Sequence, residues 1–353
     1  MSRKIAVVLF NLGGPDGQES VKPFLRNLFN DPAIIYAPWP IRPMLAWLIS
    51  TTRGPKAARE YAKMGGGSPI VPETEKQAAA LTSALQAALP GDEIRCFLAM
   101  RYWHPFTHEA VEAVKAWGAD DVVLLPLYPQ FSTTTTASSL KAWSDAGGME
   151  ARTICCFPRE TDFIAAHSDL IRKAWEEAGR PADARVLHSA HGLPEITIER
   201  GDPYQWQVEE TVKAVTALLP ELGDHITCFQ SKVGPLKWIG PSTEDMVEEA
   251  ARDGKHIILS PIAFVSEHIE TLVELDEEYA ELAHEKGAAG YTRVPALGVT
   301  EGFVRALSGL VVSALDGPAG LKPPSGVPIC PAEFGRCPCR EAGYNAEASK
   351  DAA

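Results

Sequence analysis

The feature that most constrains the fold is a series of three apolar runs that occurs twice along the chain. The runs begin near residues 5, 96 and 121 in the first half, and near residues 185, 228 and 256 in the second. Amphipathic helical patterns separate them, such as those at 73–89 and 208–219. Because apolar runs that alternate with helices form parallel sheets covered on both faces, we expect two similar, doubly wound, Rossmann-like α/β halves.

The spacing of the runs locates an insertion and the domain boundaries. The first and second runs lie about twice as far apart in the first half as in the second, which indicates an insertion in the first half. We expect a first half over 1–150 with an insertion at about 28–76, a second half over 151–300, a returning helix at 301–325 that packs on the first half, and a cysteine-bearing tail at 326–353.

The insertion is rich in apolar and aromatic residues. They come with three cations and are Trp39, Ile41, Met44, Leu45, Trp47, Leu48 and Ile49, beside Arg42, Arg53 and Lys56. One interpretation is a helical hairpin that completes the core. The other is an apolar lip at 38–50 that covers a large flat ligand and contacts a membrane from one side.

Composition excludes several classes of protein. A net charge of −13 argues against a nucleic-acid binder, which would carry a basic patch. The first apolar run has only six residues, too short for a signal peptide, and no run reaches the length of a membrane span. We therefore expect a cytoplasmic protein whose seven cysteines are reduced thiols or metal ligands.

The stretch 266–279 holds six carboxylates and one histidine, and no lysine or arginine. On a helix Glu270, Glu274 and Glu278 form one stripe, and like charges at that spacing disfavour the helix. The opposite side of the helix is apolar, so the stripe is either a solvated face or a site that needs uncompensated negative charge.

The distinctive polar segments follow the predicted strands directly. Parallel α/β sheets bind ligands beyond the carboxyl ends of their strands, so we expect these segments to converge on one cleft between the halves. They are 11–15, 101–104, 128, 191, 230–232 and 266–270. A lone histidine such as His191 is more often structural than catalytic. With His268 and Glu270 at the same edge, however, it could accept protons and hold a cation.

Seven motifs make the chain resemble the ferrochelatases, enzymes that insert Fe²⁺ into a porphyrin to make heme. The resemblance runs from residue 11 to about residue 310. Its motifs are NLGGP at 11–15, EYAKMGGGSPI at 60–70, MRYWHP at 100–105, LYPQFSTTTTASSL at 127–140, SAHGLP at 189–194, FQSKVGPLKWIGPSTED at 229–245 and AFVSEHIETLVELDEEY at 263–279.

The resemblance implies roles for the acidic stretch. His191 would be the proton acceptor, Glu270 its partner across the porphyrin ring, and both would contact the Fe²⁺ substrate. Glu267, Glu274 and Glu278 would form a path for protons or iron, while Asp276 and Glu277 would be ordinary surface. A wider helical turn there would re-aim the carboxylates.

The resemblance also implies a substrate pocket. Arg53, Tyr61 and Ser68 match positions near the propionate-bearing edge of the porphyrin, where an arginine fork suits a carboxylate. The remaining pocket residues are Leu12, Arg101, Tyr102, Tyr128, Trp238 and His268. The glycines of NLGGP and GGGSPI do not form a phosphate loop, since no Gly-Lys-Ser/Thr follows either segment.

The tail places Cys330, Cys337 and Cys339 within ten residues. Their C-x6-C-x-C spacing differs from the paired C-x-x-C of structural zinc sites, and coincidence is one explanation for it. The tail is also similar to that of ferrochelatases that carry a 2Fe–2S cluster on three tail cysteines and one from the body. The fourth ligand would be Cys96, Cys155, Cys156 or Cys228, and we favour Cys156.

The resemblance thus implies a lyase that inserts Fe²⁺ into protoporphyrin IX, the last step of heme synthesis, and releases two protons. Its partners would be porphyrin and Fe²⁺, without nucleic acid, and it would be a monomer or homodimer, cytoplasmic or peripheral on the inner membrane. Alternatives are a coproporphyrin ferrochelatase, a cobalt or nickel chelatase, a non-catalytic heme or metal carrier, and a periplasmic two-lobed binding protein.

Overall fold

A computed structural model describes residues 2–232, 234–323 and 328–341. The chain forms two compact units, one of Met1–Cys156 with Leu307–Val327 and one of Phe157–Ala306 with Pro328–Ala353. The division falls a few residues after the predicted boundary at 150. Helix α11 (Glu301–Leu315) begins in the second unit and ends in the first.

The first unit is built on a sheet of parallel strands in the order β2-β1-β3-β4-β9. Its strands are β1 (Lys4–Asn11), β2 (Glu93–Met100), β3 (Asp121–Pro126), β4 (Arg152–Ile154) and β9 (Gly320–Lys322). Its helices are α1 (Val21–Phe29), α2 (Ile41–Lys63), α3 (Ile70–Ala88), α4 (Thr107–Trp117) and α5 (Thr136–Asp145). Because β9 pairs with β4, the chain returns to the first sheet after its second half; the segment predicted as a returning helix at 301–325 contains α11 and this strand.

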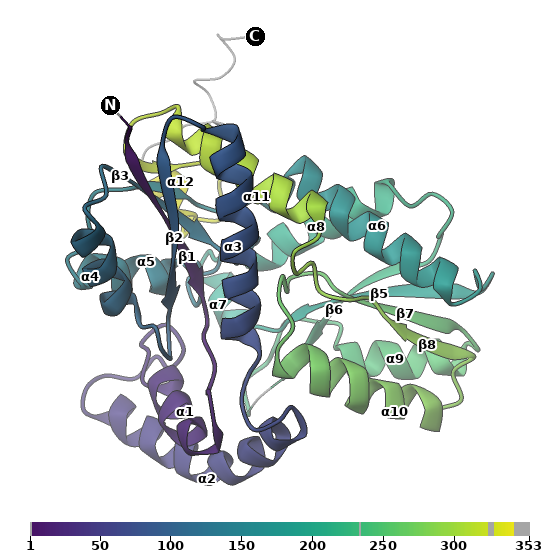
Figure 1. The fold of residues 1–353 in the computed structure, drawn as a ribbon. Coiled ribbons are helices and arrows are strands. Elements are labelled where there is room, and N and C mark those ends of the chain that lie inside the picture. The colour runs from purple at the N-terminus through teal and green to yellow at the C-terminus, as the bar shows by residue number, and fades with distance from the viewer. Residues whose placement is uncertain (1, 233, 324–327, 342–353) are drawn as a thin grey trace. The chain divides into compact units, whose positions relative to one another are not determined.

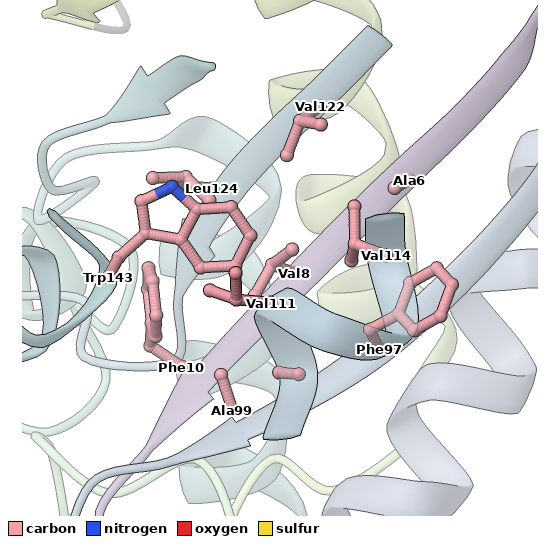
Figure 2. Packing of buried hydrophobic residues seen from close by; sticks show 11 residues of the cluster. Ala6, Val8, Phe10, Phe97, Ala99, Val111, Val114, Val122, Leu124 and Trp143 are labelled. Atoms are coloured by element: carbon pink, nitrogen blue, oxygen red, sulfur yellow. The ribbon is translucent and has the colours of Figure 1, made fainter. Parts of the chain in front are cut away.

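The core of the first unit forms around β1, whose residues Ile5–Phe10 are fully buried. Figure 2 shows one face of this core, where Trp143 of α5 packs among side chains from β1, β2, β3 and α4. The rings of Phe10 and Trp143 meet edge to face, with centroids 6.2 Å apart. A near-continuous apolar strand is what burial on both faces requires.

The second unit contains a sheet of parallel strands in the order β6-β5-β7-β8. Its strands are β5 (Ala184–His191), β6 (His225–Gln230), β7 (His256–Pro261) and β8 (Gly290–Arg293). Its helices, with α11, are α6 (Thr161–Glu177), α7 (Glu195–Glu199), α8 (Tyr204–Ala217), α9 (Thr243–Arg252), a π-helix (Glu270–Glu278), α10 (Tyr279–Glu285) and α12 (Pro338–Glu341). Helices α6 and α8 cover one face of the sheet, and α9 and α10 the other (Figure 1).

The two sheets repeat one arrangement. The first strand of each half lies between the second and the third, in the orders β2-β1-β3 and β6-β5-β7. This confirms the prediction of two similar parallel α/β halves.

The predicted insertion at 28–76 holds the end of α1, all of α2 and the start of α3. Helices α1 and α2 lie beyond the carboxyl end of β1 (Figure 1). In the part of the chain that the structure describes, the longest helices are too polar to cross a membrane.

Candidate active site

The second unit brings two of the predicted catalytic residues into contact. His191 is the last residue of β5, and Glu270 is the first residue of the π-helix. The Nδ1 atom of His191 lies 3.0 Å from Oε2 of Glu270. Among the described residues Nε2 has no hydrogen-bond partner, and the side chain is 38% exposed. The pair therefore offers one oriented ring nitrogen at the carboxyl end of the sheet.

His191 and Glu270 each shift the pKa of the other towards its charged form. Burial opposes a charge on His191, but the charge and hydrogen bond of Glu270 outweigh it and raise the pKa of the imidazole. Burial likewise opposes a charge on Glu270, yet His191 holds the pKa of that carboxyl at about 2. A raised pKa makes His191 a stronger base than a free imidazole.

The predicted wider turn is present and longer than a single bulge. The acidic stretch forms a π-helix over Glu270–Glu278, and the amide of Tyr279 donates to the carbonyl of Glu274. Val273, Leu275 and Tyr279 are buried on its apolar side, as the sequence pattern indicates. Wider helical turns of this kind are frequently found at functional sites.

Glu274 is held by four hydrogen bonds. Its carboxylate accepts from Nε2 of Gln230 at 3.0 Å, from the hydroxyl and amide of Ser231 at 2.8 and 3.1 Å, and from the hydroxyl of Tyr279 at 2.9 Å. Burial and the neighbouring Glu270 raise the pKa of Glu274. The stripe is therefore not a uniform solvated face, although Glu278 at its far end is exposed.

Two of the acidic residues bind Arg293. Asp276, expected to be ordinary surface, accepts two hydrogen bonds from the guanidinium of Arg293 at 2.6 and 2.7 Å. Glu267, expected on the path, accepts from the same guanidinium at 2.6 Å and from the amide of Ala296. Burial opposes ionisation of Glu267, but Thr271 and Arg293 lower its pKa. Asp276 is nevertheless exposed, as expected of a surface residue, and its partner Arg293 lies on β8.

Two further predicted residues, His268 and Trp238, lie near His191 and Glu270. His268 comes two residues before Glu270 in the sequence. Burial lowers the pKa of His268, so its imidazole is neutral, and its Nδ1 is buried without a hydrogen-bond partner among the described residues. Trp238 packs on the backbone that follows His191, since a Cβ at Gly192 would lie 3.1 Å from its ring. Pro194 and Trp238 also form an isolated β-bridge.

In the first unit, Arg101 and Tyr102 converge on a buried carboxylate that the sequence analysis missed. Oδ2 of Asp31 accepts from Nη2 of Arg101 at 2.7 Å, from the hydroxyl of Tyr102 at 2.9 Å and from the hydroxyl of Ser138 at 2.5 Å. Nε of Arg101 donates to Ser138 at 2.7 Å. Asp31 is 4% exposed. Arg101 therefore keeps a fixed guanidinium, with one edge bound to this network.

The other predicted pocket residues of the first unit lie on separate segments of the chain. Arg53 is exposed on α2, and Tyr61 at the end of the same helix is buried. The amide of Ser68 donates to the carbonyl of Pro15 at 2.7 Å. Leu12 accepts from the amide of Tyr102 through its carbonyl. The hydroxyl of Tyr128 is buried without a hydrogen-bond partner in the described part of the chain.

The predicted lip is an exposed apolar surface. We call it the apolar patch; its members are Tyr36 (54% exposed), Trp39 (80%), Ile41 (45%), Met44 (63%), Trp47 (51%) and Leu48 (49%). The buried side of α2 carries small residues instead, Ala46, Ser50 and Gly54, which let it pack closely on α1. These six side chains do not complete the core, which disfavours the hairpin interpretation.

The tail cysteines are buried in the second unit. Cys330, Cys337 and Cys339 are each at most 2% exposed, and Nε2 of Gln207 on α8 donates to Sγ of Cys330 at 3.1 Å. Across residues 2–232, 234–323 and 328–341, no group of three or more His, Cys, Asp or Glu side chains is arranged to hold a metal ion. Cysteine thiols are the donors that iron–sulfur clusters use.

Cys155 and Cys156, two of the candidates for the fourth ligand, follow β4, which ends at Ile154. Cys155 is 0% and Cys156 5% exposed, so burial does not distinguish them as ligands. Burial raises the pKa of Cys96 to about 11 and that of Cys228 to about 12, as expected of protonated thiols.

Comparison with known proteins settles the family. A sequence profile described as Ferrochelatase matches residues 4–315. The chain belongs to the ferrochelatase family. It is 56% identical over 343 residues to the ferrochelatase of Hyphomonas neptunium, which covers 97% of this chain and 96% of that one. The ferrochelatase of Caulobacter vibrioides is 57% identical over 343 residues, with 97% and 99% covered. Family membership makes the chain an enzyme of heme synthesis that inserts a metal into a porphyrin.

Solved structures support the fold. SirB from Bacillus subtilis, a structure with Fe³⁺, aligns with a TM-score of 0.51 at 12% identity, over 97% of this chain and 99% of that chain. At this identity the likeness shows the fold alone, and it agrees with two parallel-sheet α/β halves.

Proposed function

We propose that this ferrochelatase inserts Fe²⁺ into protoporphyrin IX to form protoheme and releases the two pyrrole protons. The contact between His191 and Glu270 carries the proposal. Metal insertion needs a base that faces the ring nitrogens and a partner that keeps this base oriented. A histidine held through Nδ1 by a carboxylate meets both needs.

Each member of the pair has a separate role. With its Nδ1–H donated to Glu270, neutral His191 carries its lone pair on Nε2, which accepts a pyrrole proton or contacts the incoming Fe²⁺. Glu270 stabilises the imidazolium that results. Iron is a substrate that must leave with the porphyrin, and two protein donors hold it less firmly than a structural site of four would.

The π-helix supplies the route for protons or iron. Glu274 lies next in the stripe and has a raised pKa, so it gains and loses a proton more readily near neutral pH than an ordinary carboxyl. The exposed Glu278 would be the solvent end of this path. The role of Glu267 would be to shape the segment before the helix, since Arg293 already binds its carboxylate.

Residues of the first unit would bind the porphyrin. Arg101 keeps a partly exposed guanidinium edge, with its side chain 25% exposed, and an arginine can bind a propionate through two hydrogen bonds. The exposed Arg53 would act in the same way at a second carboxylate. Leu12, Tyr61, Ser68, Tyr102 and Tyr128 would be further porphyrin-binding residues of this unit, and Trp238 and His268 would be those of the second unit.

The apolar patch favours protoporphyrin over coproporphyrin and a peripheral contact with a membrane. Protoporphyrin carries two carboxylates and two vinyl groups, whereas coproporphyrin carries four carboxylates, so protoporphyrin partitions into lipid more readily. Aromatic and apolar side chains on one side of a helix suit the lipid interface.

Vesicles of anionic phospholipid should retain the wild-type protein and release a Trp39→Ser, Trp47→Ser variant. The matched control is Leu218→Ser, an exposed leucine of the second unit.

A 2Fe–2S cluster on Cys156, Cys330, Cys337 and Cys339 also belongs to the proposal. Three buried thiols within one short segment support it, and no step of metal insertion is assigned to it. Iron and acid-labile sulfide should be present in purified protein and absent from each tail Cys→Ser variant. Cys155→Ser is the matched control for Cys156→Ser. If Cys155→Ser lost the cluster and Cys156→Ser kept it, Cys155 rather than Cys156 would be the fourth ligand.

The proposal is tested by anaerobic steady-state assays with Fe²⁺ and either porphyrin. We expect multiple turnovers with protoporphyrin IX and a lower kcat/KM with coproporphyrin III. A higher kcat/KM with coproporphyrin III would mean that coproporphyrin, and not protoporphyrin, is the substrate. Stoichiometric binding of heme without turnover would support the alternative of a carrier and contradict the proposal.

A further inference from the structure

The π-helix is fastened to the edge strand β8 by two side chains. The hydroxyl of Tyr291 donates to the carbonyl of Leu275 at 2.5 Å. Arg293, the last residue of β8, donates from Nε and Nη2 to the two oxygens of Asp276, at 2.6 and 2.7 Å. Such a bidentate fork fixes both the distance and the angle between its partners.

The third nitrogen of the same guanidinium reaches a different segment. Nη1 of Arg293 donates to Oε1 of Glu267 at 2.6 Å, and the amide of Ala296 donates to the same oxygen at 2.9 Å. One side chain thus joins a residue before the π-helix to a residue inside it. The segment between these two anchors contains His268 and Glu270.

The π-helix needs this external support. Its wider turns are rare and less favourable than those of an α-helix. Ile269 provides no side-chain cap at its start. Glu270 and Glu274 place like charges on neighbouring positions, which disfavours a helix further. The internal hydrogen bonds of the helix therefore do not suffice to fix the direction of Glu270.

The guanidinium is suited to this task in a way that an ammonium group is not. The side chain of Arg293 is 14% exposed and engages three oxygens with three nitrogens in one plane. A lysine supplies one compact charge on a flexible stem and cannot reproduce this geometry.

We infer that Arg293 is a positioning residue for metal insertion, which holds Glu270 against His191 by binding Glu267 and Asp276 together. This inference rests on the proposed catalytic role of Glu270. Arg293 lies outside the seven motifs of the sequence analysis and would act through Glu270, without contact to porphyrin or iron.

The first test combines Arg293→Met with Glu270→Gln. We expect Arg293→Met to lower kcat about tenfold or more with little change in KM, and to lower it less than about twofold when Glu270 is already replaced. Arg305→Met is the matched control, because Arg305 is an exposed arginine of the same unit that pairs with Asp162. A merely structural arginine would lower kcat equally in both backgrounds, and that result would overturn the inference.

Two further measurements separate the possible failures. Amide exchange should rise over 267–278 in Arg293→Met and stay unchanged in β5, and Arg293→Lys should recover only part of kcat. Unchanged exchange over 267–278, or normal turnover of folded Arg293→Met, would overturn the inference alone. Normal turnover of Glu270→Gln would instead overturn the proposed function, and this inference with it.

Discussion

Replacing Asp31 with asparagine should destabilise the first unit by about 3 kcal/mol. The change keeps the volume of the side chain and removes the charge that Arg101 and Tyr102 share. Removing one partner of a buried ion pair costs about 3–5 kcal/mol, and we take the lower end because water reaches the partly exposed Arg101. For a unit of this size, about 3 kcal/mol corresponds to a decrease in Tm of roughly 6–12 °C.

Urea denaturation of the wild type and Asp31→Asn measures this loss. Asp145→Asn is the control, since Asp145 forms an exposed ion pair with Lys141 and its side chain is 62% exposed. Such a pair contributes about 0–1 kcal/mol. A loss below about 1 kcal/mol in Asp31→Asn would refute the reasoning, because it would mean that the network around Asp31 does not depend on its charge.

Two other predictions follow from the second unit. Burial, and to a smaller extent the charges of His225 and His167, keep the pKa of His188 well below its usual value. In the unfolded chain this imidazole has an ordinary pKa of about 6.5, so below that pH the unfolded state binds one more proton than the folded state. The urea midpoint should therefore fall between about pH 7 and pH 5, and this slope should be smaller in His188→Gln; an equal slope in both proteins would contradict the assignment. Gly192→Ala would place a Cβ 2.8 Å from the carbonyl oxygen of Gln230. We therefore expect the free energy of unfolding, measured by urea denaturation, to fall by about 1–3 kcal/mol and metal insertion to become slower. An unchanged free energy of unfolding would contradict this packing.

The central strands could be predicted from the sequence because they are buried on both faces. Strands β1, β3, β5 and β7 begin within one residue of the predicted runs. Strands β2 and β6 begin three residues earlier than predicted, at Glu93 and His225. Both are edge strands whose first residues include polar, partly exposed side chains, so the apolar pattern starts late.

Features that depend on distant partners could not be predicted. Strand β4 ends at Ile154, where its pairing with β9 ends, and nothing near Cys155 indicates this limit. Asp31 bonds to Ser138, 107 residues away, and its own surroundings are typical of a turn. Arg293 likewise lies outside every recognised motif. By contrast, His191 and Glu270 could be placed at the same edge of the sheet, because His191 ends one parallel strand, Glu270 comes after another, and the carboxyl ends of such strands share one edge.

The rate of Fe²⁺ insertion by His191→Ala tests the central claim most directly. The measurement is an anaerobic assay with protoporphyrin IX, with far-UV circular dichroism to verify folding and His284→Ala, an exposed histidine of α10, as the control. We predict that folded His191→Ala is slower by about 100-fold or more, as expected when a general base is lost, and that His284→Ala is unchanged. Near-normal turnover in folded His191→Ala would contradict the assignment of His191 as the proton acceptor.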